Sequence, residues 1–339
     1  MVLPRGFSTS GPGNTRAYAE PVPPAATPAA RGLGPGLGFA VGAYGLWGLL
    51  PVYFLLLAPV GPFEIVALRI LLALAFCAIL LTVTRGWKPF LVLVTQPRVL
   101  GIMAVAGALI YINWQVYIFA ILSGHVVEGA LGYFINPLVT VVLGVVFLRE
   151  RLRVAQWVAV GISVAAILII AIGYGAFPWI ALALAFSFGL YGFIKKRVGG
   201  RVDAVSGLTI ETGLLAPVAI VILIVVSSTS GLVTGTAGVP HLVTTLFAGA
   251  ITATPLLLFA AAARRLPLVY IGLTQYLAPA MQFLFGVVVL REDMPIERWI
   301  GFALVWVALI VLTADMIAAG HARRRTSADA PESGVSGPA

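Results

Sequence analysis

The chain has 339 residues, of which 60% are apolar and only 10% are charged, and its mean hydropathy is +1.06. Soluble domains carry about 25% charged residues, so this composition excludes an ordinary soluble protein and indicates several membrane-spanning segments. The net charge of +9 does not indicate nucleic-acid binding, because the basic residues flank apolar stretches instead of alternating with aromatic ones. The single cysteine, Cys77, excludes an intrachain disulfide.

In chain order, residues 1–35 are rich in Pro, Gly and Ala and are expected to form a disordered N-terminal extension. Stretches of about 20 apolar residues, long enough to cross a bilayer, follow. Ten of them are predicted, at residues 36–57, 62–84, 99–121, 126–148, 154–173, 178–195, 205–227, 241–263, 267–290 and 298–319. Lys88–Gln96 is too short to span and is expected at the interface, and the tail 320–339 is expected to be disordered. The fold class predicted is an all-α polytopic membrane protein with five helices in 36–173 and five in 178–319.

The positions of lysine and arginine predict the orientation of these helices. With the N-terminus in the cytoplasm, 18 of the 21 lysines and arginines lie in cytoplasmic segments. Arg291 and Arg298 fall on the outer side, and Arg69 falls inside a span. Because basic residues favour the cytoplasmic side, we predict a multi-pass protein with both termini in the cytoplasm.

The two halves of the chain contain a repeat. Residues 129–168 realign on residues 271–310 without a gap, at a constant offset of 142 that matches a Pro, a Gly, an Arg-Glu pair and a Trp. Five spans per half is an odd number, so the second half is expected to be inserted upside down relative to the first. In transporters with such inverted repeats, the substrate site lies where the halves meet.

One face of the repeated helix is small, polar and interrupted by proline in both copies. Tyr133 and Pro137 follow a helical spacing, and Gln275 and Pro279 are their counterparts. Proline removes a backbone hydrogen bond, so Pro137 and Pro279 are predicted as hinges near the bilayer midplane. Tyr133 and Gln275 are predicted to contact substrate. Tight helix packing through small residues is the alternative explanation of this face.

Other polar or aromatic residues lie inside predicted spans, where polar groups are costly. The further candidates for substrate binding are Trp47, Asn113, Trp114, Asn136, Tyr191 and Tyr276. Large aromatic side chains with one polar tip suit an amphipathic or aromatic substrate. For each of these residues, simple packing is the alternative.

Three ionisable residues are predicted to act in gating or coupling. Arg69 and Glu211 are separated by the repeat offset of 142, which suggests an ion pair between the halves. Their expected depths differ, since Arg69 lies about 10 Å below the outer edge and Glu211 about 9 Å above the inner one, so direct pairing is left open. Glu128 is a candidate proton or cation site, or an interfacial residue. A structural polar network is the alternative role for Arg69 and Glu211.

The sequence contains no signature of an enzyme or a metal centre. Walker A, GxSxG, HExxH and CxxC motifs are absent, and the three histidines stand at span ends or in the tail. No catalytic residue, metal site or cofactor is therefore predicted.

Four strings in the chain are distinctive: GYFINPL at 132–138, Ile210-Glu211-Thr212, Thr254-Pro255-Leu256-Leu257 with Arg265-Leu266, and Gln275-Tyr276. In these strings the chain resembles the RarD-type members of the EamA branch of the drug/metabolite transporter superfamily. The resemblance implies a ten-helix inverted-repeat permease of the bacterial inner (cytoplasmic) membrane, and it favours export. The chain departs from the family at Ile112, Arg149 and Arg291, where glycine is common.

The prediction for function is a secondary transporter that moves a small metabolite or drug-like solute by alternating access. Its partners would be the solute and the lipid bilayer, with proton coupling through Glu128 or Glu211 left open. A channel-like facilitator is the first alternative, and a non-transporting membrane scaffold or sensor is the second. The substrate, the coupling ion and the oligomeric state are not predicted.

Overall fold

The computed structural model describes residues 33–148, 152–173, 177–198, 201–263, 265–266 and 274–328. Every regular element within these ranges is a helix. They are α1 (Leu33–Gly48), α2 (Leu50–Leu56), α3 (Pro62–Val83), α4 (Trp87–Val94), α5 (Pro97–Leu122), α6 (Val126–Leu148), α7 (Val154–Gly173), α8 (Trp179–Val198), α9 (Ala204–Thr229), α10 (Val239–Leu246), α11 (Ala248–Ala263), α13 (Leu277–Leu284), the π-helix η2 (Phe285–Val289) and α14 (Ile296–Ala328).

Eight candidate membrane spans occur among the described residues, judged by length and composition. They are Pro35–Leu56, Pro62–Val83, Pro97–Leu122, Val126–Phe147, Val154–Gly173, Ala204–Thr229, Val239–Ala262 and Ile296–Asp315. Two shorter apolar helices, Trp179–Lys195 and Leu277–Val289, accompany them. The all-helical membrane fold is therefore confirmed, whereas the count of ten spans stays a prediction.

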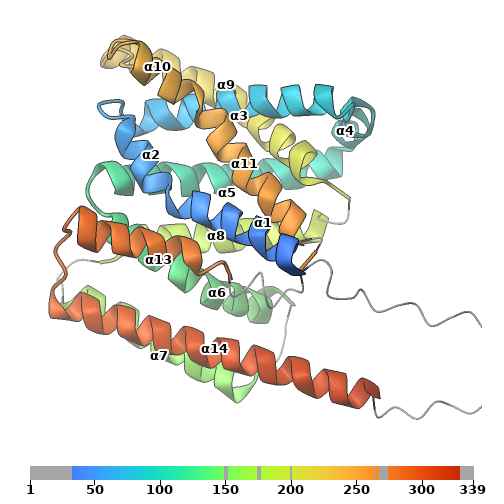
Figure 1. Cartoon of the computed structure of the whole chain (residues 1–339), viewed down its shortest axis with the longest axis vertical. Helices are drawn as coiled ribbons and strands as arrows, with labels where there is room; N and C mark the ends of the chain where they lie inside the picture. Colours follow the sequence, from blue (N-terminus) through green and yellow to red (C-terminus); the bar gives the residue numbers. More distant parts are fainter. Residues whose placement is uncertain are drawn as a thin grey trace, which may run out of the picture.

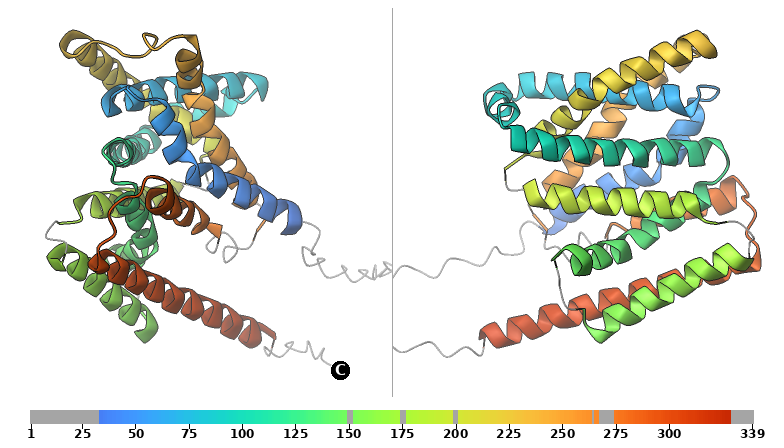
Figure 2. Two further views of the ribbon diagram at one scale, coloured as in Figure 1. Left: turned by 60° about the vertical axis from the view of Figure 1, so that its left-hand side comes forward. Right: turned by 180° about the vertical axis from the view of Figure 1, so that it is seen from behind.

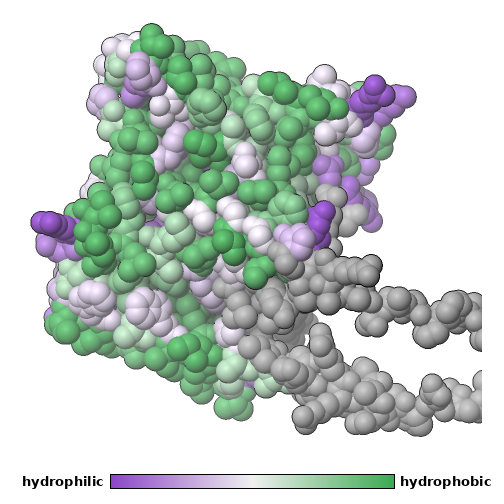
Figure 3. Space-filling view, viewed as in Figure 1, coloured by the Kyte–Doolittle hydropathy of each residue, from purple (hydrophilic) through white to green (hydrophobic). Residues whose placement is uncertain are grey.

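The outside of the bundle is apolar, as expected for a surface that faces lipid. Large side chains such as Ile79, Leu168 and Ile310 are more than half exposed. In Figure 3, hydrophobic residues cover most of the visible face, and strongly hydrophilic ones gather mainly at its left and right edges. α1 begins and α14 ends on the same side of the molecule, at the right in Figure 1. We call the opposite end the distal end.

The helices pack in pairs that join distant parts of the sequence. α3 packs on α9, α6 on α8 and α13, and α1 on α11 and α13, while α5 contacts both α8 and α9. α7 and α14 form a pair at one side of the bundle, which Figures 1 and 2 show as a separate layer. Most of the polar residues described below lie at contacts among the other helices.

Two close helix contacts depend on glycine. A Cβ at Gly249 on α11 would lie 2.3 Å from the backbone oxygen of Leu72 on α3, and one at Gly132 on α6 would lie 2.7 Å from the oxygen of Ala181 on α8. Both distances are far below van der Waals contact, so only glycine permits these approaches. Gly132 begins the GYFINPL string, and its packing against α8 gives that string a structural reason.

Several elements differ from the sequence-based expectation. The first span is divided at Leu49 into α1 and α2, and α14 continues to Ala328, well past the expected end at 319. Its sequence beyond 319 is rich in alanine and arginine, which are strong helix formers. Residues 329–339 and the extension before 33 lie outside the described residues, so their expected disorder stays a prediction.

The ninth predicted span is only partly described. Its residues 267–273 lie outside the described ranges, and a turn at Gln275 and Tyr276 leads into α13. Pro279 is the third residue of α13, where a missing N–H costs no helical hydrogen bond. Pro137, in contrast, lies inside α6. The break in the ninth span thus precedes Pro279, and the hinge roles of both prolines stay predictions.

Candidate functional site

Arg69 is a buried charge at the centre of the contact between α2, α3, α5 and α11. It is 4% exposed, and its Nε donates a 2.9 Å hydrogen bond to Oγ1 of Thr252 on α11. Its guanidinium carbon lies 4.2 Å from the ring centroid of Trp114 and 5.4 Å from that of Phe54. Among the described residues, no carboxylate lies within ion-pair distance of Arg69. Its buried Nη1 has no hydrogen-bond partner there.

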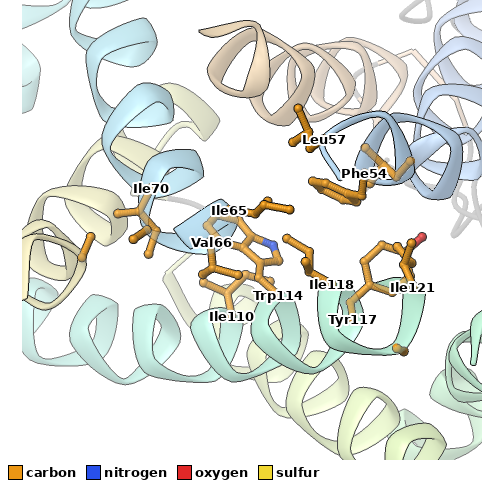
Figure 4. Packing of buried hydrophobic residues seen from close by; sticks show 14 of the residues in the cluster. Phe54, Leu57, Ile65, Val66, Ile70, Ile110, Trp114, Tyr117, Ile118 and Ile121 are labelled. Carbon is orange, nitrogen blue, oxygen red and sulfur yellow. The ribbon is translucent and has the colours of Figure 1, made fainter. Parts of the chain in front are cut away.

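Aromatic side chains surround this arginine. Figure 4 shows Phe54 on α2 facing Trp114, Tyr117 and Ile118 on α5, with Ile65 and Val66 of α3 closing the group. The rings of Phe54 and Tyr117 are 6.3 Å apart, edge to face. The buried hydroxyl of Tyr117 has no hydrogen-bond partner among the described residues. The sequence analysis predicted Trp114 here but missed Tyr117, although its spacing from Trp114 places it on the same helix face.

Asn113 and Tyr133 form a hydrogen-bonded support beside this group. The hydroxyl of Tyr133 donates to Oδ1 of Asn113 at 3.0 Å, and Nδ2 of Asn113 donates to the oxygen of Leu184 and to Oγ of Ser187. The Asn113 amide is therefore used within the protein, where it ties α5 to α6 and α8. The ring of Tyr133 packs 5.5 Å from that of Tyr117, which places it at the edge of the aromatic group.

Glu211 lies in a second polar cluster, on the side nearer the chain ends. It is 1% exposed, and its Oε1 accepts a 2.9 Å bond from Nζ of Lys195 on α8. The hydroxyl of Tyr191 donates to its other oxygen at 3.2 Å. Glu211 therefore pairs with Lys195, and Arg69 bonds to Thr252 instead, so the suggested ion pair between Arg69 and Glu211 is not formed. Lys195 follows Tyr191 by one helical turn, a signal that could have identified it.

The remaining candidates lie on α1, on α6 and in the turn at Gln275 and Tyr276 before α13. Nε2 of Gln282 donates to the backbone oxygen of Trp47, so this contact joins α13 to α1. The buried oxygens of Gln282 and Asn136 have no hydrogen-bond partner among the described residues. Tyr276 stacks on Phe134 at a ring distance of 6.5 Å. The predicted site residues are thus spread over several clusters of side chains, and the cluster around Arg69 contains more of them than any other.

Carboxylates at the distal end bind backbone N–H groups at helix starts. Glu128 accepts from the N–H groups of Ile180 and Ala181 at the start of α8. Glu292 accepts from those of Val126 and Val127 at the start of α6, and burial raises its pKa while these two bonds oppose that shift. An anion at a helix start is stabilised by the free N–H groups and the helix dipole. Glu128 thus has a capping role, and its predicted coupling role stays a prediction.

A hollow of about 440 Å³ opens at the distal end between α2, α5 and the loop after η2. It is lined by Leu55, Ile121, Leu122, Gly124, Leu290, Arg291, Glu292 and Asp293. Leu55 is adjacent to Phe54 in the chain, and Ile121 lies one helical turn beyond Tyr117. Two of its lining residues thus adjoin Phe54 and Tyr117 along α2 and α5.

Comparison with known proteins gives the family. A model of the EamA-like transporter family matches residues 34–172. The protein RarD of Streptomyces exfoliatus is 46% identical over 297 residues, which cover 87% of this chain and 94% of that protein. This chain belongs to the RarD-type EamA transporters. The RarD protein of Escherichia coli strain K12 is 38% identical over 292 residues, 86% of this chain and 97% of that protein.

The family membership confirms the resemblance found in the sequence and makes the protein a multi-pass membrane transporter with a small-molecule substrate. A solved crystal structure supports the fold independently. It is 20% identical in sequence, covers 82% of this chain and 96% of its own, and superposes with a TM-score of 0.53. At that identity, the likeness concerns the fold alone.

Proposed function

We propose that this RarD-type transporter is a secondary transporter that moves a small metabolite or drug-like solute by alternating access, in the direction of export. The observation that carries the proposal is the buried Arg69, with an unpartnered guanidinium nitrogen and aromatic walls, inside helices long enough to cross a bilayer. Unpartnered polar groups at such depth are costly in a purely structural bundle, and they are typical of a solute path.

The proposal includes an inverted repeat, which the helix contacts support. Exchanging α1, α3, α5, α6 and α7 for α8, α9, α11, α13 and α14, respectively, maps the most extensive contacts onto one another. The pair α1–α11 becomes α8–α5, α11–α3 becomes α5–α9, and α1–α13 becomes α8–α6. A pseudo-two-fold axis between the halves accounts for this exchange. In the proposal, the start of α13 at Pro279 and the middle of α6 at Pro137 act as hinges.

The proposed topology predicts that both termini are cytoplasmic, which requires an even number of crossings. The common side of the α1 start and the α14 end supports this (Figure 1). Reporter tags that are active only in the cytoplasm or only outside the membrane, fused to each terminus in turn, are expected to read cytoplasmic in both positions. A tag that reads external at one terminus would refute ten spans.

Transport itself is tested with purified protein in proteoliposomes. A ligand-stabilisation screen over amino acids, aromatic antibiotics and small metabolites first identifies a ligand. Uptake of that labelled ligand is then expected to saturate and to be accelerated by unlabelled ligand on the opposite side, because a carrier with alternating access exchanges its substrate. Flux without saturation or exchange would indicate the channel-like facilitator. A bound ligand that is never transported would indicate a scaffold or sensor.

A further inference from the structure

The charge of Arg69 is buried, and no anion among the described residues balances it. The groups that contact its guanidinium are the hydroxyl of Thr252 and the faces of Trp114 and Phe54. The Thr252 hydroxyl donates its own hydrogen to the backbone oxygen of Ala248, which leaves its oxygen free to accept from Arg69. None of these groups carries a negative charge. A buried cation of this kind is expected to have an anionic partner.

A purely structural role explains this arrangement poorly. A structural arginine inside a membrane protein uses its donors on carboxylates or backbone oxygens, because unused donors are penalised in a low dielectric. Here Nη1 of Arg69 and the hydroxyl of Tyr117 are both buried without a partner among the described residues. Two unused hydrogen-bonding groups beside the aromatic residues Phe54, Trp114 and Tyr117, which we call the aromatic enclosure, are typical of a site that a ligand completes.

We propose that Arg69 is the anchor for a carboxylate on the transported solute, with the aromatic residues Phe54, Trp114 and Tyr117 holding the apolar body of that solute. This proposal rests on the proposed transport function and names its substrate class as small organic monocarboxylates. The planar guanidinium matches a carboxylate or a phosphoryl group. One uncompensated positive charge balances one negative charge, which favours a monocarboxylate over a dianionic phosphate.

In this proposal, the solute enters from the distal hollow. Its lining residues Leu55 and Ile121 are neighbours of Phe54 and Tyr117, the aromatic residues nearest to that end. The glutamate of the hollow, Glu292, is engaged with the backbone of α6. Asn113 is likewise occupied by protein groups, so its amide positions Tyr133 and leaves Arg69 as the group that recognises charge.

The test compares acids with neutral molecules of the same shape. Purified wild-type protein is heated in the presence of acetate, benzoate, 3-phenylpropionate or indole-3-acetate, and of the amide of each. At least one aromatic acid is expected to raise the melting temperature, and its amide is expected to bind about tenfold more weakly or worse, the loss that accompanies a missing charge-assisted hydrogen bond. Phenyl phosphate is tested in the same way, to compare a phosphoryl group with a carboxylate.

The variants Arg69→Gln and Arg69→Lys locate the effect, with Arg98→Gln as the control because Arg98 is exposed at the start of α5. Arg69→Gln is expected to abolish the preference for acid over amide, Arg69→Lys to retain part of it, and Arg98→Gln to leave it unchanged. The wild-type comparison is sufficient if Arg69→Gln does not fold.

Equal protection by acid and amide, or no protection by any acid, would overturn the carboxylate site, and stronger protection by phenyl phosphate would reassign Arg69 to phosphoryl groups. Saturable exchange of a neutral solute in proteoliposomes would leave the transport function standing without this site.

Discussion

The variant Gly249→Ala is expected to separate α11 from α3 and to lower the free energy of unfolding by about 1–3 kcal/mol, the usual cost of overpacking a filled interior. The added Cβ would meet the backbone oxygen of Leu72 at 2.3 Å, and backbone atoms cannot turn aside as a flexible side chain can. Because the same helix pair carries the bond between Arg69 and Thr252, the aromatic enclosure should loosen as well.

To measure the loss of stability, the purified variant is heated, and the decrease of its monodisperse species is monitored by size-exclusion chromatography. Two controls are matched to it. Gly107 precedes Gly249 by the repeat offset of 142, and a Cβ there would lie 3.6 Å from the oxygen of Glu211, an ordinary contact. A Cβ at Gly101 would meet nothing within 4 Å. Gly107→Ala and Gly101→Ala should therefore be tolerated, and an equal loss in all three variants would contradict the packing argument.

Glu211→Gln is expected to reduce transport at least about tenfold, the size of losing one charge-assisted hydrogen bond, while the protein still accumulates in the membrane. The substitution keeps the volume of the side chain and an acceptor for Tyr191, but it removes the negative charge that holds Lys195. If the pair between α8 and α9 must be remade or protonated during the cycle, a neutral residue cannot replace it. Exchange in proteoliposomes and membrane abundance are measured together.

The double variant Glu211→Gln, Lys195→Met separates stability from mechanism. Removing one member of a buried ion pair leaves the other uncompensated, and removing both restores balance. The double variant is therefore expected to melt at a higher temperature than Glu211→Gln while remaining inactive. Normal exchange by Glu211→Gln would remove this carboxylate from the mechanism, and recovery of exchange in the double variant would make the pair purely structural.

The class of fold could be predicted from the sequence because each membrane span is recognisable from its own apolar residues. A run of about 20 apolar residues must bond its own backbone within the bilayer, which requires a helix whatever its neighbours are. For this reason α3, α5 and α9 lie within a few residues of the ranges expected for them. The GYFINPL string likewise identified the family, which the comparisons confirmed.

The partners of the polar residues could not be predicted in this way. Arg69 and Glu211 were linked by the repeat offset, yet Arg69 bonds to Thr252, 183 residues away, and Glu211 bonds to Lys195 on the preceding helix. Repeat symmetry relates equivalent positions in two halves, but it does not bring them into contact. Contacts depend on which helix faces meet.

The sequence by itself determined that this chain is a helical membrane protein with a buried arginine, because hydropathy and charge act locally along the chain. Only the tertiary structure decided that Arg69 has no carboxylate beside it and is enclosed by Phe54 and Trp114, among the residues described. It also decided that Gly249 and Gly107, which are separated by the repeat offset of 142, differ in how closely a neighbouring backbone approaches. Both outcomes depend on the separation and rotation of whole helices, which packing between distant segments sets.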